Sequence, residues 1–156
     1  MAEAYVIEAV RTAVGKRNGS LAKVHPIDLG VAAFRGLFDR VDVDPAAVDD
    51  VVVGCLDTIG PQAGNIGRNT WLAAGYPEEV PGVTVDRQCG SSQQAAHFAA
   101  QGVMAGQYDI VIAGGVDSVI GDFLSGGALA NYKAALDESF VAVSGDNRRT
   151  GLDRPV

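Results

Sequence analysis

The chain has 156 residues, which is enough for one ordinary domain with a hydrophobic core. Apolar residues make up 47% of the chain and charged residues 20%, and this composition excludes an intrinsically disordered protein. The net charge of −7 disfavours binding to nucleic acid or to an anionic membrane surface. No stretch approaches the ~20 apolar residues of a membrane span, and the start of the chain lacks a signal-peptide pattern. We therefore expect a cytoplasmic protein with reduced thiols.

The start of the chain predicts one strand and one helix. A β-prone run at Tyr5–Val10 is followed by a polar connection that extends to Val24. Pro26 suits the first turn of a helix, and apolar residues at spacings of three or four continue that helix to about Arg40. These two elements are therefore joined by a long loop.

Strands and helices then alternate. They are a strand at Val51–Leu56, a helix at Asn65–Ala74, a brief strand at Val83–Val85, a helix from about Gly90 to Ala105 and a strand at Asp109–Val116. The first and last of these strands are continuously apolar, which is typical of strands buried on both faces. This order predicts an α/β layered half-domain with a mainly parallel or mixed sheet flanked by helices.

The last part of the chain has a different pattern. Glycines interrupt it, Ala128–Leu136 is compatible with one helix, and the residues after Asp146 are polar and turn-like. We therefore predict an incomplete α/β domain at residues 1–118 and a loop-like or atypical tail at residues 119–156.

Cys89 is the candidate nucleophile. It lies between a predicted strand and a predicted helix, in the sequence DRQCGSSQQA. A thiol at a helix N-terminus faces unpaired backbone N–H groups and the positive end of the helix dipole, and both favour the thiolate. The small residues Gly90 and Ser91 leave room for a substrate carbonyl beside backbone donors. The alternative is a buried structural cysteine, and the residues alone leave both interpretations open.

The other cysteine and both histidines receive no catalytic assignment. Cys55 lies within an apolar strand and is predicted to be a small buried hydrophobe. His25 precedes a proline at a helix start and is interpreted as a loop or capping residue, and His97 as a packed or exposed helix residue. Two cysteines without a C-x-x-C pair or a Cys/His cluster predict no metal site.

Several segments together resemble the thiolases. QCGSSQQA at residues 88–95, with VTV at 83–85 before it and AGGVDS at 113–118 after it, resembles the nucleophile region of that family. VIEAVRTAVGK at residues 6–16 resembles its opening strand and loop, and AGNIGR at 63–68 resembles its second helix. Linked motifs in the same order are far more specific than one isolated signature.

This resemblance, over about residues 4 to 118, implies a thioester-dependent acyltransferase. Its reaction is either thiolysis of a 3-ketoacyl-CoA or condensation of acetyl-CoA. Cys89 is then the residue that takes the acyl group, and the backbone N–H groups of Cys89 and Gly90 hold the oxyanion. Coenzyme A and acyl-CoA are substrates, with no permanently bound cofactor. The motif around Cys89 resembles thiolases of fatty-acid or steroid side-chain breakdown more than biosynthetic ones.

Departures from the family pattern concern length and two local positions. The resemblance implies that a full thiolase is about twice this length or more and consists of two similar α/β halves plus a loop domain. In that family the activating histidine, a further oxyanion motif and an acid/base cysteine lie in the second half. Asp86 stands where asparagine is usual, and the resemblance fades after Ser118. No residues can be assigned to binding coenzyme A.

Two hypotheses follow from these patterns. The first is a thiolase-type acyltransferase that works as a homodimer or tetramer, or with a complementing chain. The second is a truncated, catalytically silent fragment that acts as an oligomerisation module, because a sheet without its closing strand leaves an unpaired edge and an apolar face. Only the first hypothesis predicts that Cys89 is acylated by a thioester. Because a general base contributes about 100- to 10,000-fold, we expect little turnover by this chain alone.

Overall fold

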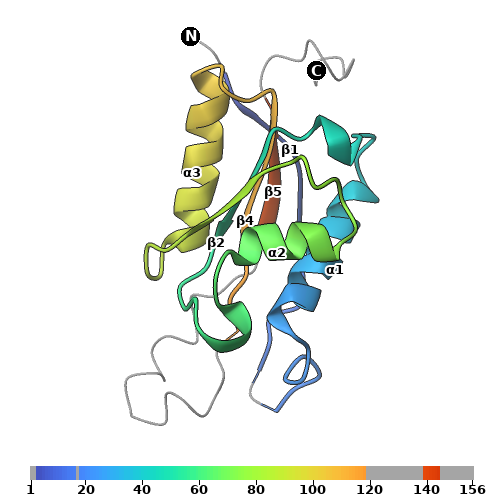
Figure 1. Cartoon of the computed structure of the whole chain (residues 1–156), viewed down its shortest axis with the longest axis vertical. Coiled ribbons are helices and arrows are strands. Elements are labelled where there is room, and N and C mark those ends of the chain that lie inside the picture. Colours follow the sequence, from blue (N-terminus) through green and yellow to red (C-terminus); the bar gives the residue numbers. More distant parts are fainter. Residues whose placement is uncertain (1–2, 17, 119–138, 145–156) are drawn as a thin grey trace.

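The computed structural model describes residues 3–16, 18–118 and 139–144 (Figure 1). Its strands are β1 (Tyr5–Arg11), β2 (Asp50–Gly54), β3 (Gly82–Val85), β4 (Ile110–Gly115) and β5 (Ser139–Ser144). Its helices are α1 (Pro26–Phe38), α2 (Ile66–Ala73) and α3 (Ser91–Met104), with two short 3₁₀ turns, η1 (Pro45–Ala47) and η2 (Gly60–Gln62). The strands and helices expected between Tyr5 and Val116 are all present, with ends that differ by one or two residues.

The strands form one mixed sheet in the order β1-β5-β4-β2-β3. β2 pairs in parallel with both β3 and β4, whereas β5 pairs antiparallel with both β1 and β4. The other four strands therefore run in one direction, and the carboxyl ends of β2, β3 and β4 lie at the same end of the sheet. Gly54 at the end of β2 lies between Val85 of β3 and Gly115 of β4.

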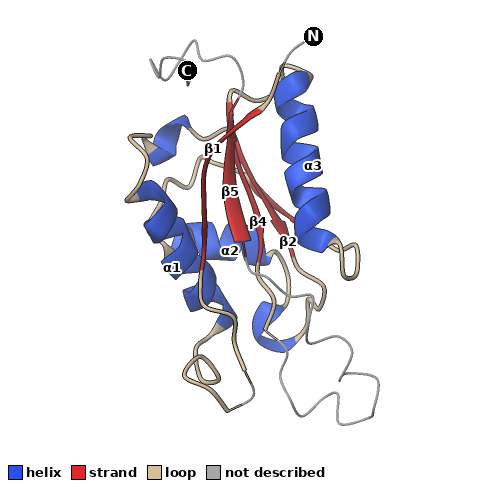
Figure 2. Ribbon diagram, turned by 180° about the vertical axis from the view of Figure 1, so that it is seen from behind, coloured by secondary structure: helices blue, strands red, loops and turns tan. Residues whose placement is uncertain are grey.

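Helices cover both faces of this sheet, as the sequence pattern predicts (Figure 2). α1 and α2 pack on one face, where Val51 and Val53 of β2 contact a cluster that includes Phe34, Leu37 and Trp71. α3 packs on the other face, where Val52 of β2 joins a second cluster of small and branched residues: Ala95, Ala99, Val103, Val111 and Ala113. Because neighbouring residues of β2 point to opposite clusters, the run from Val51 to Val53 is continuously apolar.

Local signals explain where the helices begin and end. His25 caps α1, since its Nδ1 accepts a hydrogen bond of 3.2 Å from the Ile27 N–H. Asn65 caps α2 by accepting from the Arg68 N–H, and Gly75 follows that helix with a φ of 83°. The capping interpretation of His25 is confirmed. None of the helices in the described part of the chain is long and apolar enough to cross a membrane.

β5 is the element that the sequence analysis missed. It lies within the segment expected to be loop-like, and it fills the place between β1 and β4. The edges of the described sheet are therefore β1 and β3. The helix expected at Ala128–Leu136 and the turn-like end after Asp146 lie outside the described residues. The domain boundary at residue 118 stays a prediction.

Candidate active site

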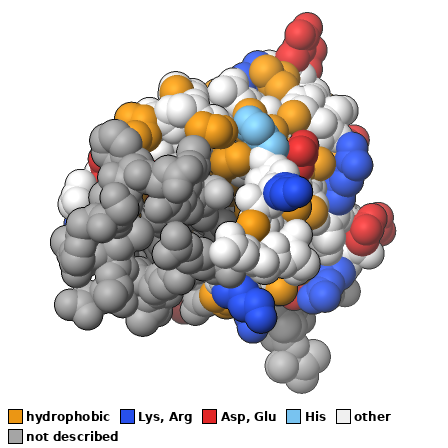
Figure 3. Space-filling model, turned by 90° about the horizontal axis from the view of Figure 1, so that it is seen from below, with side chains coloured by type: hydrophobic (Ala, Val, Ile, Leu, Met, Phe, Trp, Pro, Cys, Tyr) orange, Lys and Arg blue, Asp and Glu red, His pale blue; other side chains and the backbone are white. Residues whose placement is uncertain are grey.

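The candidate nucleophile lies at the end of the sheet where β2, β3 and β4 terminate. Two hydrogen bonds keep the strands in register just past their ends: the Cys55 N–H donates to the Val85 carbonyl, and the Val116 N–H donates to the Gly54 carbonyl, both at 3.0 Å. Figure 3 looks onto this end of the molecule and shows hydrophobic, polar and isolated charged side chains, without a continuous charged patch on its coloured part. Cys89 lies in the short connection between β3 and α3, and it is exposed.

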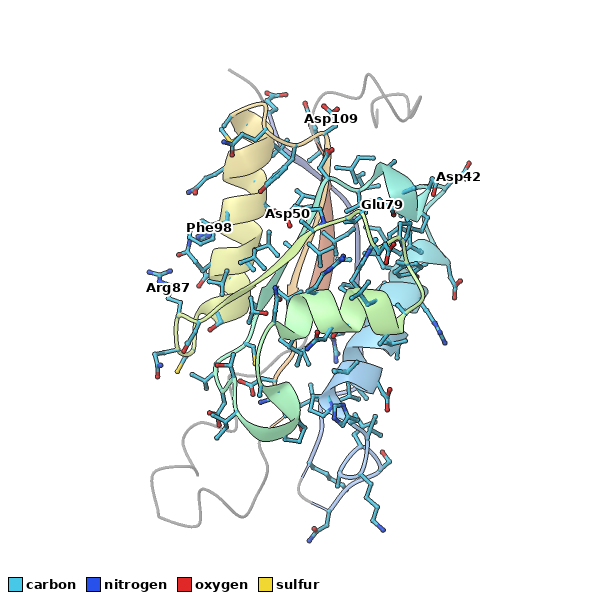
Figure 4. All side chains as sticks on the ribbon, viewed as in Figure 1. Asp42, Asp50, Glu79, Arg87, Phe98 and Asp109 are labelled. Atoms are coloured by element: carbon cyan, nitrogen blue, oxygen red, sulfur yellow. The ribbon has the colours of Figure 1, made fainter. Side chains whose placement is uncertain are left out.

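A hydrogen-bonded turn joins β3 to α3 and presents Cys89. The Gln88 N–H donates to Asp86 Oδ1 at 3.0 Å, so Asp86 holds the turn through an oxygen that asparagine also has. Although asparagine is usual at this position in the family that the sequence resembles, Asp86 therefore makes a hydrogen bond that asparagine could also make. Gln88 has a φ of 48°, in the left-handed region that residues other than glycine seldom adopt. Arg87, also in the turn, extends away from the sheet (Figure 4).

The turn uses several of its own backbone donors. The Gly90 N–H donates to the Arg87 carbonyl at 3.0 Å, and the Ser91 N–H donates to the Gln88 carbonyl at 3.2 Å. Among the residues that the structure describes, the Cys89 N–H has no hydrogen-bond partner. Of the two oxyanion donors expected from the sequence, Cys89 thus has the uncommitted N–H, whereas Gly90 has a partner within the turn. The oxyanion assignment itself stays a prediction.

Two glycines place the start of α3 against the sheet. A Cβ on Gly54 would lie 2.3 Å from the carbonyl carbon of Ser91 and the amide nitrogen of Ser92. A Cβ on Gly115 would lie 2.6 Å from the Ser92 Cβ. Both distances are shorter than any normal contact between such atoms. Only glycine at the ends of β2 and β4 lets the helix approach this closely, and this approach fixes the distance of the Cys89 turn from the sheet.

The two cysteines differ sharply in environment. Cys55 is fully buried, as predicted, and burial raises its pKa to about 11, an effect that the charge of Asp117 reinforces. Its sulfur is therefore a neutral thiol at physiological pH. Cys89 is exposed. The interpretation of Cys89 as a buried structural cysteine is wrong.

A cluster of polar groups around Gln62 lies near the same end of the sheet. Gln62 is 3% exposed, and its Nε2 donates to the Asp57 carbonyl at 2.8 Å and to Asp117 Oδ1 at 3.3 Å, while its Oε1 accepts from the Ser118 N–H. Asp117 Oδ2 is buried without a partner among the described residues, and burial raises the pKa of this carboxyl group. Gln62 therefore ties the loop after β2 to the residues that follow β4.

The histidines do not join Cys89 in a dyad. His25 caps α1, on the face of the sheet opposite α3, and His97 is exposed on α3, about 9 Å along the helix axis from Ser91. Within residues 3–16, 18–118 and 139–144, no group of three His, Cys, Asp or Glu side chains could hold a metal ion. In this part of the chain, neither histidine is placed as the general base.

Sequence reasoning missed the hydrogen bonds by which Ser91 holds the turn, and it missed the close approach of α3 to Gly54 and Gly115. Each glycine ends an apolar run, but that position alone does not show that α3 packs against it. Ser91 had no signal in the sequence, since its role depends on the backbone conformation of Gln88.

Comparisons with known proteins agree with this architecture. The family described as "Thiolase, N-terminal domain" matches residues 4–121. A steroid 3-ketoacyl-CoA thiolase from Mycobacterium tuberculosis is 71% identical over 119 residues, 76% of this chain and 29% of that protein. A beta-ketoadipyl-CoA thiolase from Acinetobacter baylyi is 44% identical over 76% of this chain and 30% of its own length.

A solved structure gives the same result in three dimensions. The crystal structure of an acetyl-CoA acetyltransferase from Bacillus anthracis superposes with a TM-score of 0.69 and 36% sequence identity. The superposition covers 74% of this chain and 29% of that one. The matched part of the present chain thus covers less than a third of the length of each of these three relatives.

Proposed function

Because this chain belongs to the thiolase family through its N-terminal domain, we propose that it carries out acyl transfer between coenzyme A thioesters, with Cys89 as the acyl-accepting nucleophile. The observation that carries this proposal is the placement of Cys89. Its thiol is exposed in a hydrogen-bonded turn just before α3, and its own N–H is uncommitted among the described residues. An accessible thiol beside an uncommitted backbone donor is an arrangement that supports attack on a carbonyl and stabilisation of the resulting oxyanion.

The chemistry divides into two half-reactions. In the first, the Cys89 thiolate attacks a carbonyl carbon of the substrate, and the carbonyl oxygen gains the negative charge that the Cys89 N–H stabilises. With acetyl-CoA, the carbon–sulfur bond to coenzyme A breaks and the thiolate of coenzyme A leaves. With a 3-ketoacyl-CoA, the thiolate attacks C3, the C2–C3 bond breaks, and C2 takes a proton to give acetyl-CoA. In the second half-reaction, a coenzyme A thiolate removes the acyl group and regenerates Cys89.

The names of the relatives support a class of substrate. The relative at 71% identity is named a steroid 3-ketoacyl-CoA thiolase, and several at about 40% identity are named 3-ketoacyl-CoA thiolases. We therefore propose a 3-ketoacyl-CoA from fatty-acid or steroid side-chain degradation as the substrate. Coenzyme A is a second substrate in this proposal and not a resident cofactor.

The exposed side of α3 is the basis for a proposal about association with another protein chain. The exposed outer side of α3 includes Phe98, which is 46% exposed, and no Asp, Glu, Lys or Arg occurs anywhere in this helix. An exposed helix without charge favours contact with a further protein surface. We propose a cytoplasmic homo-oligomer, or a complex with a chain that supplies the general base. The competing hypothesis, a silent oligomerisation module, uses the same surface but needs no reactive thiol.

The intact mass of the chain after incubation with acetyl-CoA or acetoacetyl-CoA tests the proposal. We expect an added acetyl group that is absent in Cys89→Ala and present in Cys55→Ala, the matched control for loss of a thiol. Circular dichroism of each variant checks that it is folded. A folded chain that gains no acetyl group, or that gains one independently of Cys89, would refute the proposal and favour the silent module.

A further inference from the structure

We infer that Ser91 is the positioning residue that orients the oxyanion donor of Cys89. This inference rests on the proposed function, since it assigns a second residue to the same reaction. Ser91 does not touch the substrate in this account. It acts through the peptide group that links Gln88 to Cys89.

The Ser91 side chain closes the turn with two hydrogen bonds. Its Oγ accepts from the Arg87 N–H at 2.9 Å and donates to the Gln88 carbonyl at 2.8 Å. These bonds act on both sides of Gln88, the residue with a φ of 48°. A left-handed conformation is unfavourable for a non-glycine residue, so the turn needs such contacts to keep it.

Because both groups belong to one peptide unit, fixing the Gln88 carbonyl also fixes the direction of the Cys89 N–H. The peptide unit is planar, and the bond between Gln88 and Cys89 is trans, so the Gln88 carbonyl and the Cys89 N–H point in opposite directions. The carbonyl is held toward Ser91 by both the hydroxyl and the N–H of that residue. The Cys89 N–H is consequently directed away from α3, and this fixed direction is what an oxyanion donor requires.

Ser91 is itself fixed by the sheet. Ser91 is 6% exposed, and its backbone lies against Gly54, where a Cβ would be only 2.3 Å away. Ser91 thus connects the end of β2 to the peptide group beside the nucleophile. Ser92, the next residue, contacts Gly115 but contributes no hydrogen bond to the turn.

Two reactions of the Cys89 thiol distinguish a misoriented oxyanion donor from a general loss of thiol reactivity. Acetylation by acetyl-CoA passes through an oxyanion, whereas alkylation by iodoacetamide displaces iodide at a saturated carbon and forms none. We expect Ser91→Ala to slow acetylation of Cys89 by about 10-fold or more relative to alkylation, since removing an oxyanion donor costs about 100- to 1,000-fold. Ser92→Ala is the matched control and should leave the ratio of the two rates unchanged. Ser91→Thr, which keeps the hydroxyl, should restore the ratio.

The opposite results would overturn the inference. Equal slowing of both reactions in Ser91→Ala would show a merely structural role, and wild-type rates in both reactions would show that Ser91 has no role in orienting the donor. If the wild-type chain is alkylated at Cys89 but not acetylated, the proposed function fails, and a crystal structure of Ser91→Ala then tests the geometry alone. We expect Gln88 to leave the left-handed region in that structure, and an unaltered Gln88–Cys89 peptide plane would refute the claim.

Discussion

Gly54→Ala tests whether the close contact between the sheet and α3 controls the nucleophile. The new Cβ would lie 2.3 Å from the Ser91 carbonyl carbon and the Ser92 nitrogen, and 2.6 Å from the Ser91 carbonyl oxygen. All three atoms belong to the backbone, so no side chain can rotate aside. Because carbon atoms pack at about 3.5–4.0 Å, the start of α3 must retreat by about 1 Å or more.

This displacement has consequences for stability and for reactivity. Forcing extra atoms into a packed site costs about 1–3 kcal/mol, so the free energy of unfolding should fall by that amount. A displacement of about 1 Å in a catalytic group can lower its rate about 100-fold. Acetylation of Cys89 should therefore fall by much more than the loss of folded protein accounts for.

The assay combines denaturant unfolding with the rate of acetylation at a temperature where the variant is folded. Gly36→Ala is the matched control, since Gly36 lies within α1 and a Cβ there would meet no atom of another described element within 4 Å. This control should raise the free energy of unfolding by about 0.5–1 kcal/mol and leave acetylation unchanged. If Gly54→Ala matches the wild type in both measurements, the argument from close contact is refuted.

Three further predictions concern the core and the thiols. Thr70 is fully buried and its Oγ1 has no partner among the described residues, so Thr70→Val should raise the free energy of unfolding by about 1 kcal/mol; a decrease in urea unfolding would contradict this. The raised pKa of Asp117 means that the folded chain binds a proton more readily than the unfolded chain, so its contribution to stability falls as pH rises through that pKa. Asp117→Asn should therefore be more stable than the wild type at neutral pH, by a margin that shrinks as pH falls, and a margin independent of pH in thermal melts would oppose this account. Iodoacetamide should label Cys89 alone in the native chain and also Cys55 after unfolding, because Cys55 is buried with a pKa of about 11; equal labelling of both in the native chain would count against the assignment.

The strands that build the site were predictable because their residues follow strong patterns. β2 and β4 are continuous apolar runs with a core on each face, and the small residues of α3 mark the face that packs on them. Cys89 was predictable as a candidate because it stands between a strand and a helix. In each case the signal lies within a few neighbouring residues.

What could not be predicted depends on contacts between distant residues. β5 is six residues long and gains its place by pairing with β1, which lies at the opposite end of the chain. A short apolar run does not reveal such a partner. The role of Ser91 depends on the positive φ of Gln88, and no residue type at that position announces it. Gly54 and Gly115 acquire meaning only when α3 is placed against them.

The most direct test of the central claim is the exchange of isotopically labelled coenzyme A into unlabelled acetyl-CoA. Exchange requires that the acetyl group pass from coenzyme A to the protein and back again. The account predicts exchange that is slow, because general-base activation contributes about 100- to 10,000-fold, and that disappears in Cys89→Ala but persists in Cys55→Ala. A folded chain without exchange, or exchange at the same rate in Cys89→Ala, would contradict the claim that Cys89 carries the acyl group.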